Sequence, residues 1–353
     1  MAPTVDTVTE RELIARIRGQ LPPAPDWMLV GIGDDAAVVE PERNRIEVLT
    51  VDALVEGIHF ERALVPPDAI GHRALAVNLS DLAAMGAAPR LALLSMALPA
   101  ALPLADFDDI IAGFTALAAR HRLHVAGGNL TRSPGPLMID VTVMGTVKRR
   151  QALTRGGARP GDDVYVSGSI GAAAAGLRLL QSSAGRGQSS VSRAQSRSSV
   201  GAAETADSRL IGAYLRPEPR LALGIHLARN RAASACMDLS DGLADGITQI
   251  AEASGVGITI DAGALPIDPA ARAVFESRGG EATIEALTGG DDYELLIAVR
   301  PRSQRRLTAA MQRGEVALTR VGRCTAERGV TLRGAGGASI DAALLPRGFT
   351  HFR

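Results

Sequence analysis

Residues 69–87 constrain the fold more than any other segment, because they combine helical spacing with almost no charge. Only His72, Arg73 and Asp81 carry titratable side chains there. A helix this apolar is buried, and an unpaired carboxylate on its buried face costs several kcal/mol. Asp81 follows Asn78 by three residues and lies on the same helix face. The fold must therefore bury this helix and supply something that compensates Asp81.

Strand patterns alternate with helical patterns along the chain. Apolar and polar residues alternate in 46–51, a strand predicted to end at Asp52, and in 137–147. Strands mixed with helices indicate an α/β or α+β fold, not a helical bundle or a β-sandwich. Further strands are predicted at 164–166, 257–260 and 294–299, and helices at 10–19 (capped near Thr9), 69–87, 107–122, 172–180, 219–230 and 241–254.

The length of 353 residues suits two domains, at roughly 150 residues per domain. Residues 154–162 are rich in Gly, Pro and Arg, which is typical of a turn and marks a natural boundary between domains. We therefore expect an N-terminal αβ domain at 1–150 and a C-terminal αβ domain at 151–353. Residues 181–208 are mostly Ser, Gly, Ala, Gln and Arg and cannot bury enough apolar surface, so they are predicted to be a mobile insert.

The amino-acid composition limits which kinds of molecule the protein is expected to bind. The 38 basic and 38 acidic residues give a formal net charge of zero, and aromatic residues make up 3%. We therefore expect neither nucleic acid nor an anionic membrane as a partner. No apolar run approaches the roughly 20 residues of a membrane-spanning helix, and the N-terminal segment is unlike a signal peptide. Cys236 and Cys324 belong to no cluster, so a reduced, cytoplasmic protein is expected.

Lys148 is the only lysine. The chain therefore lacks the phosphate-binding lysine of a Walker motif and the strand lysine of protein kinases, and no GxxxxGK[ST] string is present. If the protein handles phosphates, metal ions and arginines must neutralise their charge.

Carboxylates recur at glycine turns, at strand ends and in the apolar helix. Each one alone is more often a turn residue or a helix cap, and Ser240 or Asp241 is predicted to cap the helix at 241–254. Two carboxylates about 4 Å apart repel by roughly 4 kcal/mol at an effective dielectric constant near 20, so a cleft holding four or five of them needs protonation or cations. Acidic oxygen ligands suit Mg²⁺, and no His or Cys pair suits zinc. The sites are Asp34 and Asp35, Asp52, Asp81, Asp238 and Asp241, and Asp291 and Asp292.

At these positions the chain resembles the thiamine-monophosphate kinase family, within the wider superfamily of aminoimidazole ribonucleotide synthetase folds. The resemblance implies two αβ domains with mixed sheets flanked by helices, ATP and several Mg²⁺ ions in a cleft, and a homodimer formed by the N-terminal domain. The C-terminal domain is expected to complete the active site. The matching strings lie at 31–35, 51–60, 74–86, 152–155, 237–243, 289–296 and 348–352.

The resemblance also implies roles for individual residues. Asp52, Asp81 and Asp238 are the expected catalytic residues, acting through bound magnesium. His59 and Asp291 are expected to contact the thiamine phosphate, although a loop role is the alternative for His59. The expected magnesium ligands are Asp35, Asp52, Asp81, Asp238 and Asp241 with a main-chain oxygen of Thr50 or Val51, and the expected nucleotide contacts are Gly128, Arg155 and Ser240. For Arg155 a solvated turn charge is the alternative.

Three positions depart from the family pattern. Asn129 stands where many relatives carry Asp, so it keeps an oxygen ligand for nucleotide-bound metal but loses a charge. Ala172 stands where relatives often carry Asp. Pro346 aligns with a tryptophan that can flank the thiamine ring, and is the third expected substrate contact.

The implied reaction is direct in-line transfer of the ATP γ-phosphoryl group to thiamine monophosphate. The acceptor phosphate is already anionic, so screening of charge matters more than a strong base. A selenophosphate synthetase is disfavoured because no cysteine or lysine lies near the N-terminus, and a hydrogenase-maturation protein because the sequence ends His351-Phe352-Arg353. A purine synthetase, and a nucleotide-binding protein that has lost catalysis, stay open as alternatives.

Overall fold

The computed structural model describes residues 3–185, 205–334 and 339–341. These residues form two compact units. Unit 1 holds residues 3–79, 89–148 and 183–185, and unit 2 holds 80–88, 149–182, 205–334 and 339–341. The domain boundary expected between residues 150 and 151 stays a prediction. Each unit is described by itself below.

Unit 1 begins with a short 3₁₀ helix, η1 (Val5–Thr7), and helix α1 (Glu10–Gln20). The Thr9 hydroxyl accepts the Glu12 N–H, and the Glu12 carboxylate accepts the Thr9 N–H at 2.7 Å. This reciprocal pair is a capping box and satisfies two backbone donors at the helix start. It confirms the helix and the cap that the sequence predicts.

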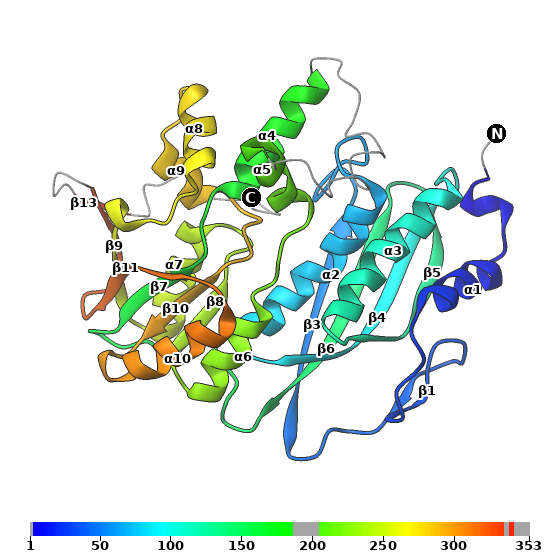
Figure 1. Ribbon diagram of the computed structural model, residues 1–353, viewed down its shortest axis with the longest axis horizontal. Coiled ribbons are helices and arrows are strands. Elements are labelled where there is room, and N and C mark those ends of the chain that lie inside the picture. Colours follow the sequence, from blue (N-terminus) through cyan, green and yellow to red (C-terminus); the bar gives the residue numbers. More distant parts are fainter. Residues whose placement is uncertain (1–2, 186–204, 335–338, 342–353) are drawn as a thin grey trace. The chain divides into compact units, whose positions relative to one another are not determined.

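The core of unit 1 is a four-stranded sheet in the order β3-β6-β4-β5. Helices α2 (Pro67–Ala84) and α3 (Leu104–Arg120) lie against one face of this sheet (Figure 1). They pack closely, because a Cβ at Gly71 of α2 would lie 1.8 Å from the Ile110 carbonyl oxygen of α3. The strands are β3 (Arg45–Val55), β4 (Ala88–Pro99), β5 (His124–Ser133) and β6 (Met138–Lys148). Outside this sheet, β1 (Met28–Val30) and β2 (Val38–Val39) pair in antiparallel fashion.

Strand β3 corrects one prediction. It was expected to end at Asp52 but continues to Val55, because antiparallel pairing with β6 persists as far as Val55 opposite Met138. The apolar residues at 53–55 favour this extension. Asp52 therefore lies inside a strand, paired with Val141, and is half-buried.

Unit 2 is built on a seven-stranded mixed sheet in the order β13-β12-β9-β11-β7-β10-β8. Only β9 and β12 pair in parallel among its assigned pairs. The strands are β7 (Asp163–Ser167), β8 (Ala235–Asp238), β9 (Gly257–Asp261), β10 (Leu295–Val299), β11 (Leu318–Thr325), β12 (Gly329–Arg333) and β13 (Ser339–Asp341). The helices are α4 (Ala172–Gly185), α5 (Ala206–Leu215), α6 (Leu221–Asn230), α7 (Leu243–Ser254), α8 (Pro269–Ser277), α9 (Ala282–Thr288) and α10 (Gln304–Gly314), with 3₁₀ turns η2 (Ala262–Ala264) and η3 (Pro301–Ser303).

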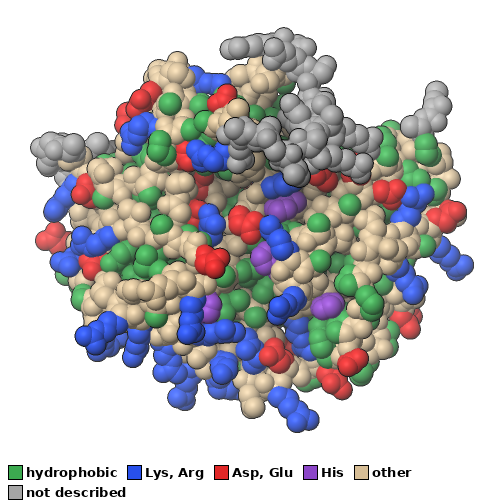
Figure 2. Space-filling model, viewed as in Figure 1, with side chains coloured by type: hydrophobic (Ala, Val, Ile, Leu, Met, Phe, Trp, Pro, Cys, Tyr) green, Lys and Arg blue, Asp and Glu red, His purple; other side chains and the backbone are tan. Residues whose placement is uncertain are grey.

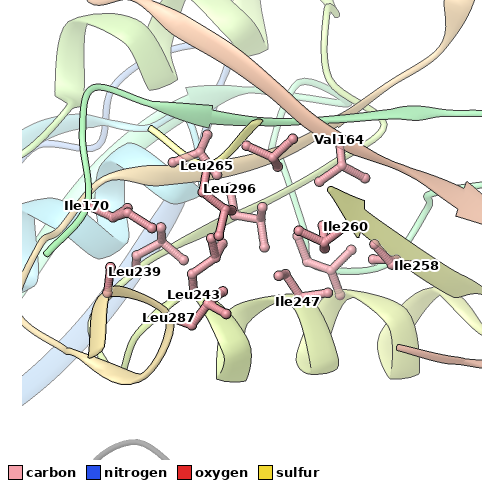
Figure 3. Packing of buried hydrophobic residues seen from close by; sticks show 14 of the residues in the cluster. Val164, Ile170, Leu239, Leu243, Ile247, Ile258, Ile260, Leu265, Leu287 and Leu296 are labelled. Atoms are coloured by element: carbon pink, nitrogen blue, oxygen red, sulfur yellow. The ribbon is translucent and has the colours of Figure 1, made fainter. Parts of the chain in front are cut away.

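Helix α7 is fixed to the sheet of unit 2 by a buried apolar cluster. Figure 3 shows Leu243 and Ile247 of α7 facing Ile258 and Ile260 of β9 and Leu296 of β10. Each of these five side chains is at most 1% exposed, and full burial of such a side chain contributes about 1.5–3 kcal/mol. This packing holds the segment between β8 and α7 in place, and that segment carries predicted site residues.

The α/β class with mixed sheets is confirmed, and two local predictions are wrong. Helix α7 begins at Leu243 with Gly242 as its N-cap residue, so neither Ser240 nor Asp241 caps it. Within 181–208, residues 181–185 continue α4, and Thr205 caps α5. The rest of the predicted insert, 186–204, lies outside the described residues. No helix in the described part of the chain is long and apolar enough to cross a membrane.

Candidate functional site

Two predicted site residues of unit 2 lie close enough to influence each other's ionisation. Asp238 ends strand β8 and is 4% exposed, and Asp81 is half-buried in the last turn of α2. Burial, and next the negative charge of Asp81, raise the pKa of Asp238 to about 7. The Ser80 hydroxyl donates a 2.8 Å hydrogen bond to Asp238 Oδ2 and, with the charge of Arg155, opposes that rise in pKa. The fold thus holds two carboxylates together against their repulsion.

Arg155 is oriented beside this pair. It is exposed in the irregular segment before β7, and its Nη1 donates to Gln249 Oε1 at 2.5 Å. Gln249 lies on α7 and donates in turn to the Asp245 carboxylate of the same helix. Arg155 is therefore held by α7 while its charge acts on Asp238. A guanidinium in such a position can bind phosphate through several donors.

Main-chain hydrogen bonds join the two acidic segments of unit 2. The N–H of Asp291 donates to the Ser240 carbonyl at 2.8 Å, the N–H of Tyr293 donates to the Leu239 carbonyl at 3.0 Å, and the N–H of Leu239 donates to the Glu294 carbonyl at 2.8 Å. Asp291 adopts φ of +68°, and its Oδ1 accepts the Tyr293 hydroxyl at 3.1 Å. Segment 238–241, which contains the half-buried Asp241, is therefore anchored to segment 291–294.

Gly242 allows the chain to turn from β8 into α7. Its φ is +101°, a conformation that side chains with a Cβ rarely adopt. A Cβ at this position would lie 2.9 Å from the Gly289 carbonyl oxygen. Glycine is therefore required here, which explains one residue of the motif at 237–243.

Two acidic residues of this region have structural roles that the sequence did not indicate. Asp292 accepts the N–H groups of Gly171 at 2.7 Å and Ala173 at 3.3 Å at the start of α4, and burial raises its pKa to about 8. Glu294 is 3% exposed and forms a two-point ion pair with Arg220. These contacts join residues 74 or more positions apart, so no local pattern could have signalled them.

The predicted site residues of unit 1 lie on its loops and sheet. Asp35 is exposed between β1 and β2, and its N–H donates to the Asp34 carboxylate. Thr50, Val51 and Asp52 follow one another in β3, so Thr50 and Asp52 share a face of the sheet and Val51 is on the other. Val51 is 59% exposed.

Glycine at 128 is a steric requirement of the sheet. A Cβ there would lie 1.8 Å from the Leu94 carbonyl oxygen of the neighbouring strand β4. Gly128 and Asn129 are exposed in the middle of β5, opposite Leu94 and Ser95. The predicted contacts of these two residues with the nucleotide and its metal stay predictions.

His59 closes a loop of unit 1. Its Nδ1 accepts the Val55 N–H at 2.9 Å, which fixes the turn that follows β3. This contact supports the loop role for His59, and its contact with substrate stays a prediction.

Within unit 2, the structure thus brings together predicted residues from three separate parts of the sequence. These are Asp81, Arg155 and the segment 238–241. Asp291 is joined to them through Ser240. Pro346 lies outside the described residues. No group of three or more His, Cys, Asp or Glu side chains placed to hold a metal ion occurs among the residues that the structure describes. Acidic and basic side chains are mixed over the face shown in Figure 2, in keeping with the net charge of zero.

Two family models match the chain. The N-terminal domain of AIR synthase related proteins matches residues 33–147, and the C-terminal domain matches residues 159–335. The chain is therefore a two-domain AIR synthase related protein. Thiamine-monophosphate kinase of Escherichia coli K12 is 37% identical over 321 residues, which cover 90% of this chain and 91% of the relative. The chain belongs to the thiamine-monophosphate kinase family, and the resemblance drawn from its motifs is confirmed.

Solved structures agree with this assignment. The crystal structure of thiamine-monophosphate kinase from Stenotrophomonas maltophilia K279a is 39% identical, with a TM-score of 0.78 over 94% of this chain and 98% of that one. A structure described as AaThiL complexed with AMPPCP and TMP is 31% identical, with a TM-score of 0.73 over the whole of both chains. The fold and the family therefore agree over nearly the full length.

Proposed function

We propose that this protein transfers the γ-phosphoryl group of ATP to thiamine monophosphate, giving thiamine diphosphate and ADP. An oxygen of the acceptor phosphate forms the new bond to the γ-phosphorus, and the bond from that phosphorus to the ADP oxygen breaks. The family assignment supports this reaction, and so does the relative whose structure is described with AMPPCP and TMP.

The observation that carries the proposal is the pairing of Asp81 with Asp238 beside Arg155. Two carboxylates held together against repulsion are costly unless a cation or a proton compensates them. Arg155 supplies a positive charge that can contact an entering phosphate, and Ser80 holds the carboxylate of Asp238 in one orientation. These residues bind and orient, which is most of what phosphoryl transfer to an anionic acceptor requires.

We also propose that Asp81 and Asp238 bind Mg²⁺. Their oxygen donors suit this ion, and the repulsion that raises the pKa of Asp238 is what a divalent cation relieves. When bound, Mg²⁺ would screen the charge of the two phosphates from each other. Further ligands remain predictions: Asp35, Asp52, Asn129, Asp241 and a main-chain oxygen of Thr50 or Val51.

A homodimer through the uncovered face of the unit 1 sheet belongs to the same proposal. Leu49 and Val51 of β3 are 66% and 59% exposed, and Met138 of β6 is 37% exposed. The register pairs Val55 with Met138, so these side chains share the sheet face opposite α2 and α3. Apolar side chains gathered on one sheet face mark an interaction surface, and a second copy of the chain is the occupant we propose. We further propose that the protein is cytoplasmic and binds neither nucleic acid nor membrane.

The test is incubation of purified protein with ATP, MgCl₂ and thiamine monophosphate, followed by chromatographic separation of the thiamine phosphates. We expect thiamine diphosphate and ADP in equal amounts, and no product when EDTA replaces MgCl₂. Tight binding of ATP without any thiamine diphosphate would instead support a nucleotide-binding protein that has lost catalysis.

A further inference from the structure

Strands β1 and β2 form a hairpin whose connecting loop, residues 31–37, is acidic at its tip. The strands pair through Met28 and Val39, and the loop contains Asp34 and Asp35. Asp35 is exposed, and its N–H donates to the Asp34 carboxylate at 2.8 Å, a contact inside the loop itself. The hairpin is not part of the four-stranded sheet. Contacts with the rest of unit 1 must therefore fix where Asp35 lies.

An apolar cluster attaches the hairpin to the sheet. Met28 of β1 is 7% exposed and packs with one buried residue from each of three strands: Leu91 of β4, Ala126 of β5 and Met144 of β6. Trp27, Ala37 and Val39 pack against this cluster. Burial of apolar surface stabilises without a preferred direction, so the cluster holds the hairpin on the sheet but does not by itself set its angle.

Arg90 supplies a directional contact. This residue of β4 is 8% exposed, and its guanidinium lies 4.3 Å from the centre of the Trp27 ring and donates to the Glu40 carbonyl. Trp27 directly precedes β1 and Glu40 directly follows β2, and the Glu40 N–H donates to the Trp27 carbonyl at 2.8 Å. The His124 ring meets the Trp27 ring edge-on at 5.6 Å. One guanidinium therefore contacts both ends of the hairpin.

Arginine is a costly residue at this position. The Nη1 of Arg90 is buried and has no hydrogen-bond acceptor among the residues that the structure describes. An unpaired buried donor costs free energy of the same order as a cation–π contact returns. An apolar side chain would pack here without that cost. The planar guanidinium instead offers a face that stacks on a ring and donors that lie in its plane. Arg90 therefore contributes orientation more than stability.

We propose that Arg90 and Trp27 are positioning residues, which orient the hairpin of β1 and β2 and thereby place Asp35 in the active site. This inference rests on the proposed function, in which Asp35 is an expected magnesium ligand. Groups of an active site must be held within about 0.5 Å of their working positions. A rotation at the base of the hairpin, where Trp27 and Glu40 lie, is enlarged at its tip.

Fluorescence tests the first half of the inference, because Trp27 is the only tryptophan. Arg90→Leu should raise the quenching of Trp27 by acrylamide about twofold through local opening, with little change in the urea midpoint. Arg90→Lys keeps the charge but not the planar stack and should give an intermediate value. Arg45→Leu is the matched control, because Arg45 donates to the Thr146 carbonyl and pairs with Glu42, both outside the hairpin. Unchanged quenching in Arg90→Leu would overturn the inference.

A double-mutant cycle with Asp35→Asn tests the second half. Calorimetry measures the affinity for AMPPCP in the presence of MgCl₂, and kcat/KM for ATP should follow it. Arg90→Leu should weaken AMPPCP binding about fivefold in the wild-type background but less than about 1.5-fold in the Asp35→Asn background, where no ligand is left to place. Equal losses in both backgrounds would show that Arg90 does not act through Asp35 and would overturn the inference. Because binding needs no turnover, this result decides the matter even if the wild-type protein makes no thiamine diphosphate.

Discussion

Ser80, near the end of helix α2, donates a 2.8 Å hydrogen bond to Asp238, which lies 158 residues further along the chain at the end of strand β8. Both residues belong to unit 2 and both are buried. This bond ties the carboxylate that ends β8 to the residue that precedes Asp81. Through this contact the polar residues of the motif at 74–86 lie beside those of the motif at 237–243.

Replacement of Asp238 by Asn should abolish most of the activity without unfolding the protein. The amide cannot supply a negative charge to Mg²⁺, so kcat should fall roughly 100-fold or more. The change also removes the repulsion from Asp81, so the melting temperature should stay the same or rise. Asp207→Asn, at an exposed position of α5, is the control for a lost surface charge. Near-normal kcat in Asp238→Asn would remove the metal assignment.

Asp52→Asn tests the corresponding prediction in unit 1. Because Asp52 is half-buried within β3, the isosteric amide should preserve the strand while turnover falls by orders of magnitude. Thermal unfolding and steady-state kinetics on the same sample separate the two effects. An active, folded Asp52→Asn variant would remove Asp52 from the catalytic residues.

Ser80→Ala should move the pH dependence of activity to higher pH. The Ser80 hydroxyl stabilises the ionised form of Asp238 and thereby lowers its pKa, which burial and Asp81 raise to about 7. If activity needs ionised Asp238, the activity of the wild-type protein rises with pH near 7. In Ser80→Ala the pKa of Asp238 is higher, so the same rise in activity should occur at higher pH. The profile of kcat/KM from pH 5.5 to 9 at saturating Mg²⁺ measures the shift. A profile that keeps its midpoint but drops uniformly would assign Ser80 a packing role only.

Asp292→Asn should make the stability less dependent on pH. Burial raises the pKa of Asp292 to about 8 from an ordinary value of 3.8, so the folded state holds a proton that the unfolded state releases between these values. The free energy of unfolding therefore falls as the pH rises through that window. The variant should lose this slope, and it should lose about 1 kcal/mol at low pH because the Gly171 and Ala173 N–H groups bond to two different oxygens of Asp292, whereas the amide offers one. Urea unfolding at pH 4.5 and pH 8 measures both effects, and an identical pH slope in both proteins would contradict them.

Glu294→Gln should destabilise unit 2 strongly. It leaves the Arg220 guanidinium, which is mostly buried, without its charged partner, and breaking such a pair costs about 3–5 kcal/mol. Glu276→Gln breaks an exposed ion pair with Arg272 and should cost less than about 1 kcal/mol. Denaturant unfolding of the two variants provides the comparison, and equal costs would mean that the buried pair contributes no more than a surface pair.

Leu49→Arg should shift the protein from dimer to monomer. A charge in the middle of the exposed apolar face of β3 has no partner when two such faces meet. Leu29→Arg is the control, because Leu29 is 60% exposed but lies in β1, outside that sheet. Light scattering gives the mass of each variant, and a dimeric Leu49→Arg variant would place the interface elsewhere.

Sequence periodicity predicted the elements whose signals are local. Helix α1 is predicted with a cap near Thr9, and in the structure Thr9 and Glu12 form a capping box within four residues. Strand β4 (Ala88–Pro99) was not predicted, because its run of apolar residues near Leu91–Leu98 lacks the alternation that separates a strand from a helix. The cap of α7 was assigned to Ser240 or Asp241, but the positive φ of Gly242 decides the turn.

The chemistry of the candidate site was predictable in kind but not in its contacts. The motifs identified Asp81 and Asp238, yet their pairing depends on tertiary contacts within unit 2, among them the hydrogen bond from Ser80 to Asp238. The ion pair of Arg220 with Glu294 had no local signal, because the two residues lie 74 positions apart in the sequence. A sequence pattern identifies which residues are unusual, whereas packing decides which of them meet.

The main-chain hydrogen bonds between Leu239, Ser240 and the segment 291–294 also limit how this region can change. An insertion or deletion in segment 238–241 or in segment 291–294 would move the N–H groups of one segment away from the carbonyl groups of the other. Buried N–H groups would then lack hydrogen-bond acceptors. Neither segment can therefore gain or lose a residue alone. Variation in loop length within unit 2 should accumulate away from these two segments.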